Sequence, residues 1–336
     1  MSSARILEVR DLQVTYDSAR GGVRAVDGVD LNVHRGEFVG VVGESGCGKS
    51  TLLFAIAQLL SPPAAITGGS VLFSGRNLVT LNDKQLRAMR WRDYSVVMQS
   101  AMNALNPVRS IGQQFQDTLE AHRDTPVSDD RAVEVMRLVG IDPIHLKSYP
   151  HQLSGGMRQR AMIAMALLFT PDLIIMDEPT SALDVVAQRS LMVQIKELQR
   201  ELGFAVIFVT HDMSLVSHFS DNLLVMYAGQ VAEIGPTRQV FDSPAHPYSR
   251  GLLDAFPSIR GPRVELTGIP GSPPDLAQPP TGCRFHPRCP LVKERCLVEE
   301  PALYPVGTAY ARCLWHAPHS LSLSDPIPLQ IAVETA

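Results

Sequence analysis

The sequence predicts an α/β protein whose core is a mostly parallel sheet, and two observations support that fold class. An apolar run at 38–42 is followed by a glycine-rich loop and then by apolar residues at helical spacing over 51–60. Further apolar, strand-like segments at 172–176, 205–210 and 222–227 are separated by helical patterns. Strands that alternate with helices form parallel sheets, and ligands gather at the carboxyl ends of such strands.

The glycine-rich loop fits the phosphate-binding pattern G-x-x-x-x-G-K-[ST]. Glycines let successive backbone N–H groups turn toward an anion, and the start of the following helix adds its positive dipole end. We expect Lys49 to reach the outer phosphates of a nucleotide and the Ser50 hydroxyl to bind Mg²⁺. The predicted nucleotide-binding residues of this phosphate loop are Gly43, Glu44, Ser45, Gly46, Cys47, Gly48, Lys49, Ser50 and Thr51.

The N-terminal part is predicted to be antiparallel. Residues 6–14 and 26–33 alternate between apolar and polar and read as strands, with Gly21-Gly22 as the turn between them. Residues 68–78 form another strand-like piece. Tyr16 follows the first strand, where an aromatic ring can stack on a nucleotide base.

The middle of the chain, about 100–168, is interpreted as a helical subdomain inserted between strands. Ser128 is predicted to be the N-cap of its second helix. The expected helices cover residues 111–122, 129–139 and 154–168.

Polar side chains follow three of the predicted strands. The apolar run 173–176 ends in Asp177, the expected magnesium partner of the phosphate loop, and Glu178, which is placed to orient or deprotonate a water beside the γ-phosphate. Gln99 and His211 end two other strands, so both are expected at the same edge of the sheet. There Gln99 would contact magnesium or water, and His211 would donate to the γ-phosphate.

A second helix start able to hold an anion lies at 153–159. Ser154 resembles an N-cap, and Gly155-Gly156 leaves backbone N–H groups bare. Since the chain already has a phosphate loop, this segment raises the question of which anion it holds.

Taken together, these motifs resemble the ATP-binding cassette (ABC) ATPases over about residues 5–240. The resemblance implies a cassette fold with a phosphate-loop core, an antiparallel β subdomain and a helical subdomain, in which Glu178 and His211 are catalytic. It also implies that two cassettes dimerise head to tail, so that the signature residues of each act on the ATP held by the other. The motif residues occur in the family's order: Tyr16, Gly43–Thr51, Gln99, the signature with Ser154, Gly155, Gly156 and Gln159, then Asp177, Glu178, the Ser181–Asp184 segment with Asp184, and His211.

Segments 153–167, 243–253, 269–276 and 283–290 further resemble the ATPases of peptide (dipeptide/oligopeptide/nickel) importers, D-type. This resemblance implies a peripheral subunit at the cytoplasmic face of the membrane that hydrolyses ATP with Mg²⁺ to power the import of di- or oligopeptides. The implied partners are an F-type ATPase subunit, two integral membrane permease subunits and an extracytoplasmic solute-binding protein. An importer of nickel or oligosaccharide is the alternative, followed by a non-transport ABC ATPase. The interval 99–153 is too short for the long coiled coil of the chromosome-type proteins.

Composition narrows the classes of partner and compartment. A net charge of −4 gives no sign of a nucleic-acid partner. No run of eighteen apolar residues exists and the first residues lack an apolar stretch, so neither a membrane span nor a signal peptide is expected. We therefore expect an intracellular protein whose thiols are reduced or bound to metal.

Four cysteines, Cys283, Cys289, Cys296 and Cys313, lie in a proline-rich segment, which we assign as a C-terminal extension over 241–316 after a cassette at 1–240. Their intervals, C-x5-C, C-x6-C and C-x16-C, lack the tight pairs of structural zinc sites, while iron–sulfur clusters accept more varied spacing. Disulfides and plain buried thiols are the other options, and for zinc His286 or His316 can replace one thiolate. The family resemblance points to a structural [4Fe–4S] cluster held by the four cysteines. Residues 317–336 are expected to be a disordered tail.

Overall fold

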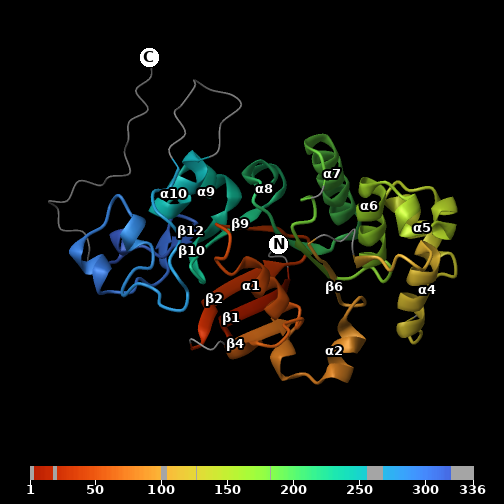
Figure 1. The fold of residues 1–336 in the computed structure, drawn as a ribbon, viewed down its shortest axis with the longest axis horizontal. Helices are drawn as coiled ribbons and strands as arrows, with labels where there is room; N and C mark the ends of the chain where they lie inside the picture. Colours follow the sequence, from red (N-terminus) through yellow and green to blue (C-terminus); the bar gives the residue numbers. More distant parts are fainter. Residues whose placement is uncertain are drawn as a thin grey trace, which may run out of the picture.

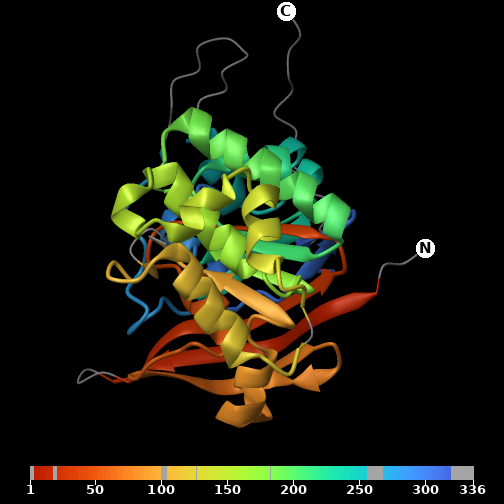
Figure 2. The same cartoon turned by 90° about the vertical axis from the view of Figure 1, so that its right-hand side faces the viewer.

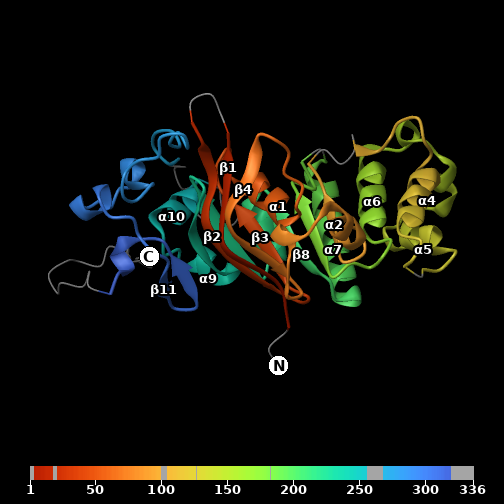
Figure 3. The ribbon, with the colours of Figure 1, turned by 90° about the horizontal axis from the view of Figure 1, so that it is seen from below.

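Three parts of the chain lie in a row along the long axis of the molecule. The computed structural model describes residues 4–17, 21–99, 104–125, 127–181, 183–255 and 268–318. The two sheets lie in the middle, the helices α4, α5 and α6 lie at one end, and the C-terminal extension lies at the other (Figures 1 and 3). Residues 319–336, most of the expected tail, are outside the described residues.

The main sheet has eight strands in the order β11-β12-β10-β9-β3-β8-β7-β6. The strands from β9 to β6 are parallel, and β10, β11 and β12 are antiparallel at one side. Every residue of β3, β7 and β8 is buried, as expected for parallel strands covered on both faces. The bounds are β3 Phe38–Val42, β6 Tyr94–Val97, β7 Leu173–Asp177, β8 Ala205–Val209, β9 Asn222–Tyr227, β10 Gln230–Pro236, β11 Tyr304–Val306 and β12 Ala309–Ala311.

The second sheet is antiparallel, as predicted, with the order β2-β1-β4-β5. In Figure 2 it lies, in red and orange, on the opposite side of the molecule from the long green helix α7. Apolar side chains of this sheet, of helix α1 and of the facing side of the main sheet form one continuous core. Its strands are β1 Arg5–Tyr16, β2 Val23–His34, β4 Ala64–Phe73 and β5 Arg76–Asn77.

The helices follow the predicted pattern with two local differences. Helix α1 ends at Ile56 rather than near residue 60, and Gln58 beyond it has a left-handed backbone with φ 54°. Helix α5 begins at Arg131, so Ser128 is not its N-cap; the Ser128 hydroxyl instead accepts from the N–H of Asp130 in the preceding turn (3.2 Å). The bounds are α1 Lys49–Ile56, α2 Asp83–Met89, α4 Ile111–Ala121, α5 Arg131–Leu138, α6 Gly155–Ala166, α7 Val185–Leu202, α8 Met213–Phe219, α9 Thr237–Asp242 and α10 Pro247–Asp254.

The C-terminal extension is not only the loop-rich segment that its prolines predict, because two of its strands continue the main sheet. β12 pairs with β10, Glu233 opposite Ala311 and Ile234 opposite Tyr310. Gly235 permits this approach: a Cβ there would lie 2.4 Å from the Cβ of Ala309. Within the described ranges, no helix has the length and apolar character needed to cross a bilayer.

Candidate nucleotide-binding and hydrolysis site

The phosphate loop is held tightly between β2 and the end of β9. Gly43 and Gly48 have φ angles of 149° and 104°, which favour glycine. A Cβ on Gly43 would lie 2.2 Å from the carbonyl oxygen of Met226, and one on Gly48 would lie 2.2 Å from that of Ala25. The loop path therefore requires glycine at both positions.

Lys49 lies at the centre of this loop. Its Nζ donates to the carbonyl oxygens of Gly43 (2.8 Å) and Glu44 (2.9 Å), and the residue is only 9% exposed. Burial raises the pKa of the neighbouring Cys47 thiol, although the charge of Lys49 opposes that shift. The ammonium group is thus fixed within the loop, where it can meet the phosphates of a nucleotide.

Ser50 and Asp177 meet although they are far apart in the sequence. The Ser50 hydroxyl donates to Oδ1 of Asp177 across 3.1 Å, and Asp177 is 2% exposed at the end of β7. Burial raises the pKa of this carboxyl group; Ser50 and Lys49 oppose the shift and Glu178 adds to it. A buried carboxylate beside a hydroxyl is a ligand pair that suits Mg²⁺.

Glu178, Gln99 and His211 also converge, at the carboxyl ends of β7, β6 and β8. The Gln99 side-chain amide donates to Oε2 of Glu178 (3.0 Å), and Nδ1 of His211 lies 3.5 Å from Oε1. The structure therefore pairs Gln99 with Glu178 rather than with Asp177. Glu178 has a left-handed backbone with φ 45°, and its N–H donates to the Val209 carbonyl (3.0 Å), which fixes the turn that presents the carboxylate. A hollow beside it is lined by Glu178, Thr180, Ser181, Val185, Gln188, Thr210, His211 and Asp212.

Tyr16 lies beside the start of α1. Its hydroxyl is 3.1 Å from Oγ1 of Thr51, so the aromatic residue at the end of β1 reaches the last residue of the phosphate loop. The stacking of Tyr16 on a nucleotide base stays a prediction.

The second helix start belongs to α6. Ser154 is exposed and caps the helix by accepting from the N–H of Met157 (3.3 Å), and nothing lies within 4 Å of a Cβ built on Gly156. Gln159 is 4% exposed in this chain, and its action on a partner's nucleotide, which the family resemblance implies, stays a prediction. Five residues along an α-helix correspond to about 140° of rotation, which turns Gln159 inward. Asp184 caps α7 by accepting from the N–H of Ala187 (2.9 Å), while Ala182 lies outside the described residues.

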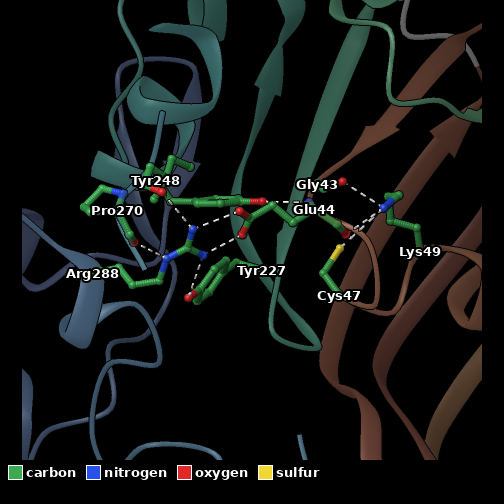
Figure 4. Close-up of polar contacts among 9 residues, drawn as sticks. Gly43, Glu44, Cys47, Lys49, Tyr227, Tyr248, Pro270 and Arg288 are labelled. Carbon is green, nitrogen blue, oxygen red and sulfur yellow. Dashed lines mark hydrogen bonds and ion pairs between the residues drawn. The ribbon is translucent and has the colours of Figure 1, made fainter. Parts of the chain in front are cut away.

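Two residues that the sequence analysis missed contact the phosphate loop from the C-terminal extension (Figure 4). The Tyr248 hydroxyl accepts from the N–H of Glu44 (2.8 Å). The Arg288 guanidinium donates to both carboxylate oxygens of Glu44, at 2.6 and 2.9 Å. These partners are 204 and 244 residues from Glu44, so no local pattern could have indicated them.

The four late cysteines are all free thiols in one part of the extension. Burial, reinforced by the other cysteines, raises the pKa of Cys289 to about 11 and that of Cys313 to about 12. The N–H of Cys283 donates to the Cys296 carbonyl (2.9 Å). Across the described ranges, no three His, Cys, Asp or Glu side chains are arranged as ligands of one metal ion.

The two histidines considered as replacement ligands contact backbone carbonyls. Nδ1 of His286 lies 2.9 Å from the Cys283 carbonyl oxygen, and Nε2 of His316 lies 2.9 Å from that of Ala245. Each contact engages one ring nitrogen only, and a metal-binding histidine commonly donates its other ring N–H to a carbonyl, so these contacts do not decide against zinc.

Comparison with known proteins places these features in context. The profile of the ABC transporter family matches residues 26–181, and the profile of the oligopeptide/dipeptide transporter C-terminal region matches residues 232–296. The dipeptide transport ATP-binding protein DppD of Bacillus subtilis is 45% identical over 85% of this chain and 87% of its own length. The oligopeptide transport ATP-binding protein OppD of Salmonella typhimurium is 43% identical, over 87% and 88%. The dimeric post-hydrolysis structure of the ATP-binding cassette MJ0796 with ADP and Pi has a TM-score of 0.62 and 30% identity, and covers 69% of this chain and 99% of its own.

Proposed function

Because the chain belongs to the ATP-binding subunits of the ABC dipeptide and oligopeptide transporter family, we propose that it powers the import of di- and oligopeptides. The observation that carries this proposal is the match of the extension to the profile of the oligopeptide/dipeptide transporter C-terminal region, beside the match of the cassette to the general ABC transporter profile. The relatives named for dipeptide and oligopeptide transport support the same class of solute.

The proposed use of ATP follows from the site. Lys49 and the phosphate-loop amides would hold the phosphates, with Tyr16 beside the base. Ser50 and Asp177, together with Gln99, would hold Mg²⁺, which supplies positive charge to the phosphates as charge develops during hydrolysis. Glu178 would orient or deprotonate the attacking water, with His211 alongside it to contact the γ-phosphate.

The proposed assembly pairs this chain with a second cassette of the F type. The exposed start of α6, with Ser154, Gly155 and Gly156, would complete the nucleotide site of that partner. Asp184, which caps α7, would lie at the same interface. The other proposed partners are two membrane permease subunits and an extracytoplasmic solute-binding protein, which would place this chain at the cytoplasmic face of the membrane.

Reconstitution tests this proposal. The chain is co-expressed with two permease subunits and a companion cassette, and the purified complex is placed in proteoliposomes. We expect ATP turnover to rise when the binding protein is loaded with a di- or oligopeptide. Stimulation by nickel or an oligosaccharide alone would identify the alternative solute. Full turnover by a monomeric preparation would contradict the requirement for a second cassette.

We also propose that Cys283, Cys289, Cys296 and Cys313 hold an iron–sulfur cluster that has a structural role. Cys296 and Cys313 are buried and Cys283 and Cys289 are half-buried, and the other three thiols raise the pKa of Cys313; these features support the proposal. Buried thiols resist ionisation unless a cation compensates, and iron compensates thiolates in such clusters. A four-iron cluster is larger than one ion, so its thiolates stand farther apart than the ligands of a single zinc. When bound, the cluster would cross-link segments of the proline-rich extension.

Metal analysis of anaerobically purified protein tests the cluster. We expect brown protein with about four irons per chain. If the protein contained one zinc per chain and no iron, the four cysteines would be assigned to a zinc site instead of a cluster. Absence of both metals, with all four thiols open to alkylation in the folded protein, would contradict any metal site.

A further inference from the structure

In the loop between Cys283 and Cys289, the side chain of Arg288 is hydrogen-bonded through every one of its donors. Arg288 is 6% exposed, and all five of its N–H donors have acceptors. Two of the bonds go to Glu44 and the others to the Pro270 carbonyl (2.8 Å), the Tyr227 hydroxyl (3.4 Å) and the Ile269 carbonyl (3.4 Å). A guanidinium this completely bonded is held in one orientation, and Glu44 is its only charged partner among the described residues.

Glu44 is correspondingly held through each of its polar groups. Its N–H donates to the Tyr248 hydroxyl, its carboxylate accepts two bonds from Arg288, and its carbonyl accepts from Lys49 (2.9 Å). Two of these three groups are therefore fixed by residues beyond position 240. The fork of Arg288 and the Tyr248 hydroxyl reach the phosphate loop from the same side (Figure 4).

A second arginine of the same loop supports the phosphate loop indirectly. Arg284 forms a buried ion pair with Asp27 and donates to the Ala228 carbonyl. The next residue, Gly229, donates its N–H to the Cys47 carbonyl in the phosphate loop (3.0 Å). The loop 283–289 thus contacts both Glu44 and the turn that supports Cys47.

The charge of Glu44 makes its pairing important for nucleotide binding. A free carboxylate within a loop that receives phosphates would repel them, most strongly where water is excluded. A bidentate guanidinium neutralises this charge and fixes its direction. We propose that Arg288 is a positioning residue for ATP, which acts through Glu44 by neutralising that carboxylate and holding the phosphate loop in shape. This inference rests on the proposed nucleotide site.

A charge-swap series in the full-length protein tests the proposal. Arg288→Gln leaves Glu44 unpaired, and we expect the Kd for ATP to rise about tenfold, with the rise smaller at high salt. Adding Glu44→Gln removes the unpaired charge, so the double variant should regain an affinity within about threefold of the wild type. A residue with only a packing role would not be rescued by removal of a second contact.

Arg295→Gln is the matched control. It breaks an Arg–Glu pair of the same extension, with Glu299 at 2.9 Å, that lies on the surface. Its Kd for ATP should equal that of the wild type.

The remaining outcomes separate the two proposals. Wild-type affinity in Arg288→Gln, or a double variant as weak as the single one, overturns the role of Arg288. A wild-type protein that binds no ATP instead overturns the nucleotide site. If Arg288→Gln does not fold, Arg288→Lys decides, because it keeps the charge without the fork: affinity within about threefold of the wild type supports neutralisation, and a tenfold loss that Glu44→Gln does not restore overturns the proposal.

Discussion

The two glycine-rich helix starts of this chain differ in how completely the chain itself surrounds them. At the phosphate loop, Gly43 and Gly48 lie against backbone carbonyls, and Glu44 is fixed by the C-terminal extension. At the start of α6, Ser154 is exposed and the space around Gly156 is open. The first site is shaped before a ligand arrives, whereas the second leaves its N–H groups bare, and we propose that it meets a nucleotide held by a second cassette.

The two sites therefore differ in the free energy that must be spent on ordering them when a ligand binds. A preformed loop does not have to be ordered when ATP binds, so more of the contact energy contributes to affinity. In the proposed assembly, the dipole and amides at the open start of α6 would contribute to binding only after a second cassette has closed against it. We therefore expect substitutions at the two sites to separate ATP binding by this chain from ATP turnover by the assembly.

The largest expected effect tests whether the enclosed site performs chemistry of its own. Glu178→Gln keeps the shape of the side chain but removes its charge, so ATP should still bind while turnover falls by roughly 100-fold or more. The measurement is phosphate release by the assembled transporter whose companion cassette is inactivated. Glu201→Gln, on the exposed side of α7, is the control and should turn over normally. Wild-type turnover in Glu178→Gln would assign the chemistry to another residue.

The second prediction concerns the open site. Gly156→Glu places a negative charge where a partner's phosphate is expected, so turnover of the assembly should fall by roughly tenfold to 100-fold. ATP binding by the isolated chain should not change, in contrast to Lys49→Ala, which should lose it. Gly156→Ala is the steric control, because a Cβ there meets no atom within 4 Å. Equal loss of binding in Gly156→Glu and Lys49→Ala would remove the distinction between the two helix starts.

The third prediction concerns the attachment of the extension that encloses the phosphate loop. Gly235→Ala forces a Cβ against Ala309 at 2.4 Å, so β12 must move away from β10. We expect the free energy of unfolding to fall by about 1–3 kcal/mol, as in other overpacked sites. Urea unfolding measures it, and Gly268→Ala, where a Cβ meets nothing within 4 Å, is the control. An unchanged free energy of unfolding would show that β12 can shift away from β10 without loss of stability.

The smallest expected effect is a pH dependence from the same region. Burial lowers the pKa of His246 to about 3. The unfolded chain takes up a proton near pH 6.5 and the folded chain does not, so stability is lost as pH falls from about 6.5 toward 3. Between pH 7 and pH 6 this amounts to about 0.7 kcal/mol.

His246→Asn isolates that contribution. Asparagine is also a good N-cap and can replace the bond that His246 Nδ1 accepts from the Tyr248 N–H (2.9 Å). The difference in unfolding free energy between pH 7 and pH 6 should therefore shrink by about 0.7 kcal/mol in the variant. An identical difference in both proteins would show that His246 is not the group responsible.

Features set by neighbouring residues were predictable from the sequence. The phosphate loop and the cap at Ser154 follow from glycines and a hydroxyl at fixed intervals, and apolar strands carry Asp177 and Glu178 to their ends. Gln99 was correctly expected near this edge, but its choice of Glu178 over Asp177 depends on side-chain geometry that no spacing encodes.

Features set by distant residues were not predictable. Strands β11 and β12 are three residues each, too short for an alternating pattern to indicate them in the sequence, and they form because β10 leaves an edge to pair with. The burial of Gln159 on α6 also depends on the elements packed against that helix rather than on its neighbours in the sequence. The contacts of Tyr248 and Arg288 with Glu44 join residues that are far apart in the sequence, and no local sequence motif links them.

The pairing of Glu44 with Arg288 also has a consequence for the order of events during synthesis. The phosphate loop leaves the ribosome early, but its arginine follows 244 residues later. At the usual rate of translation that interval lasts on the order of 10–50 s, and long-range contacts of this kind form late in folding. A nascent cassette therefore carries an unbraced phosphate loop for most of its synthesis, and we expect it to gain its full affinity for ATP only after residue 288 has emerged.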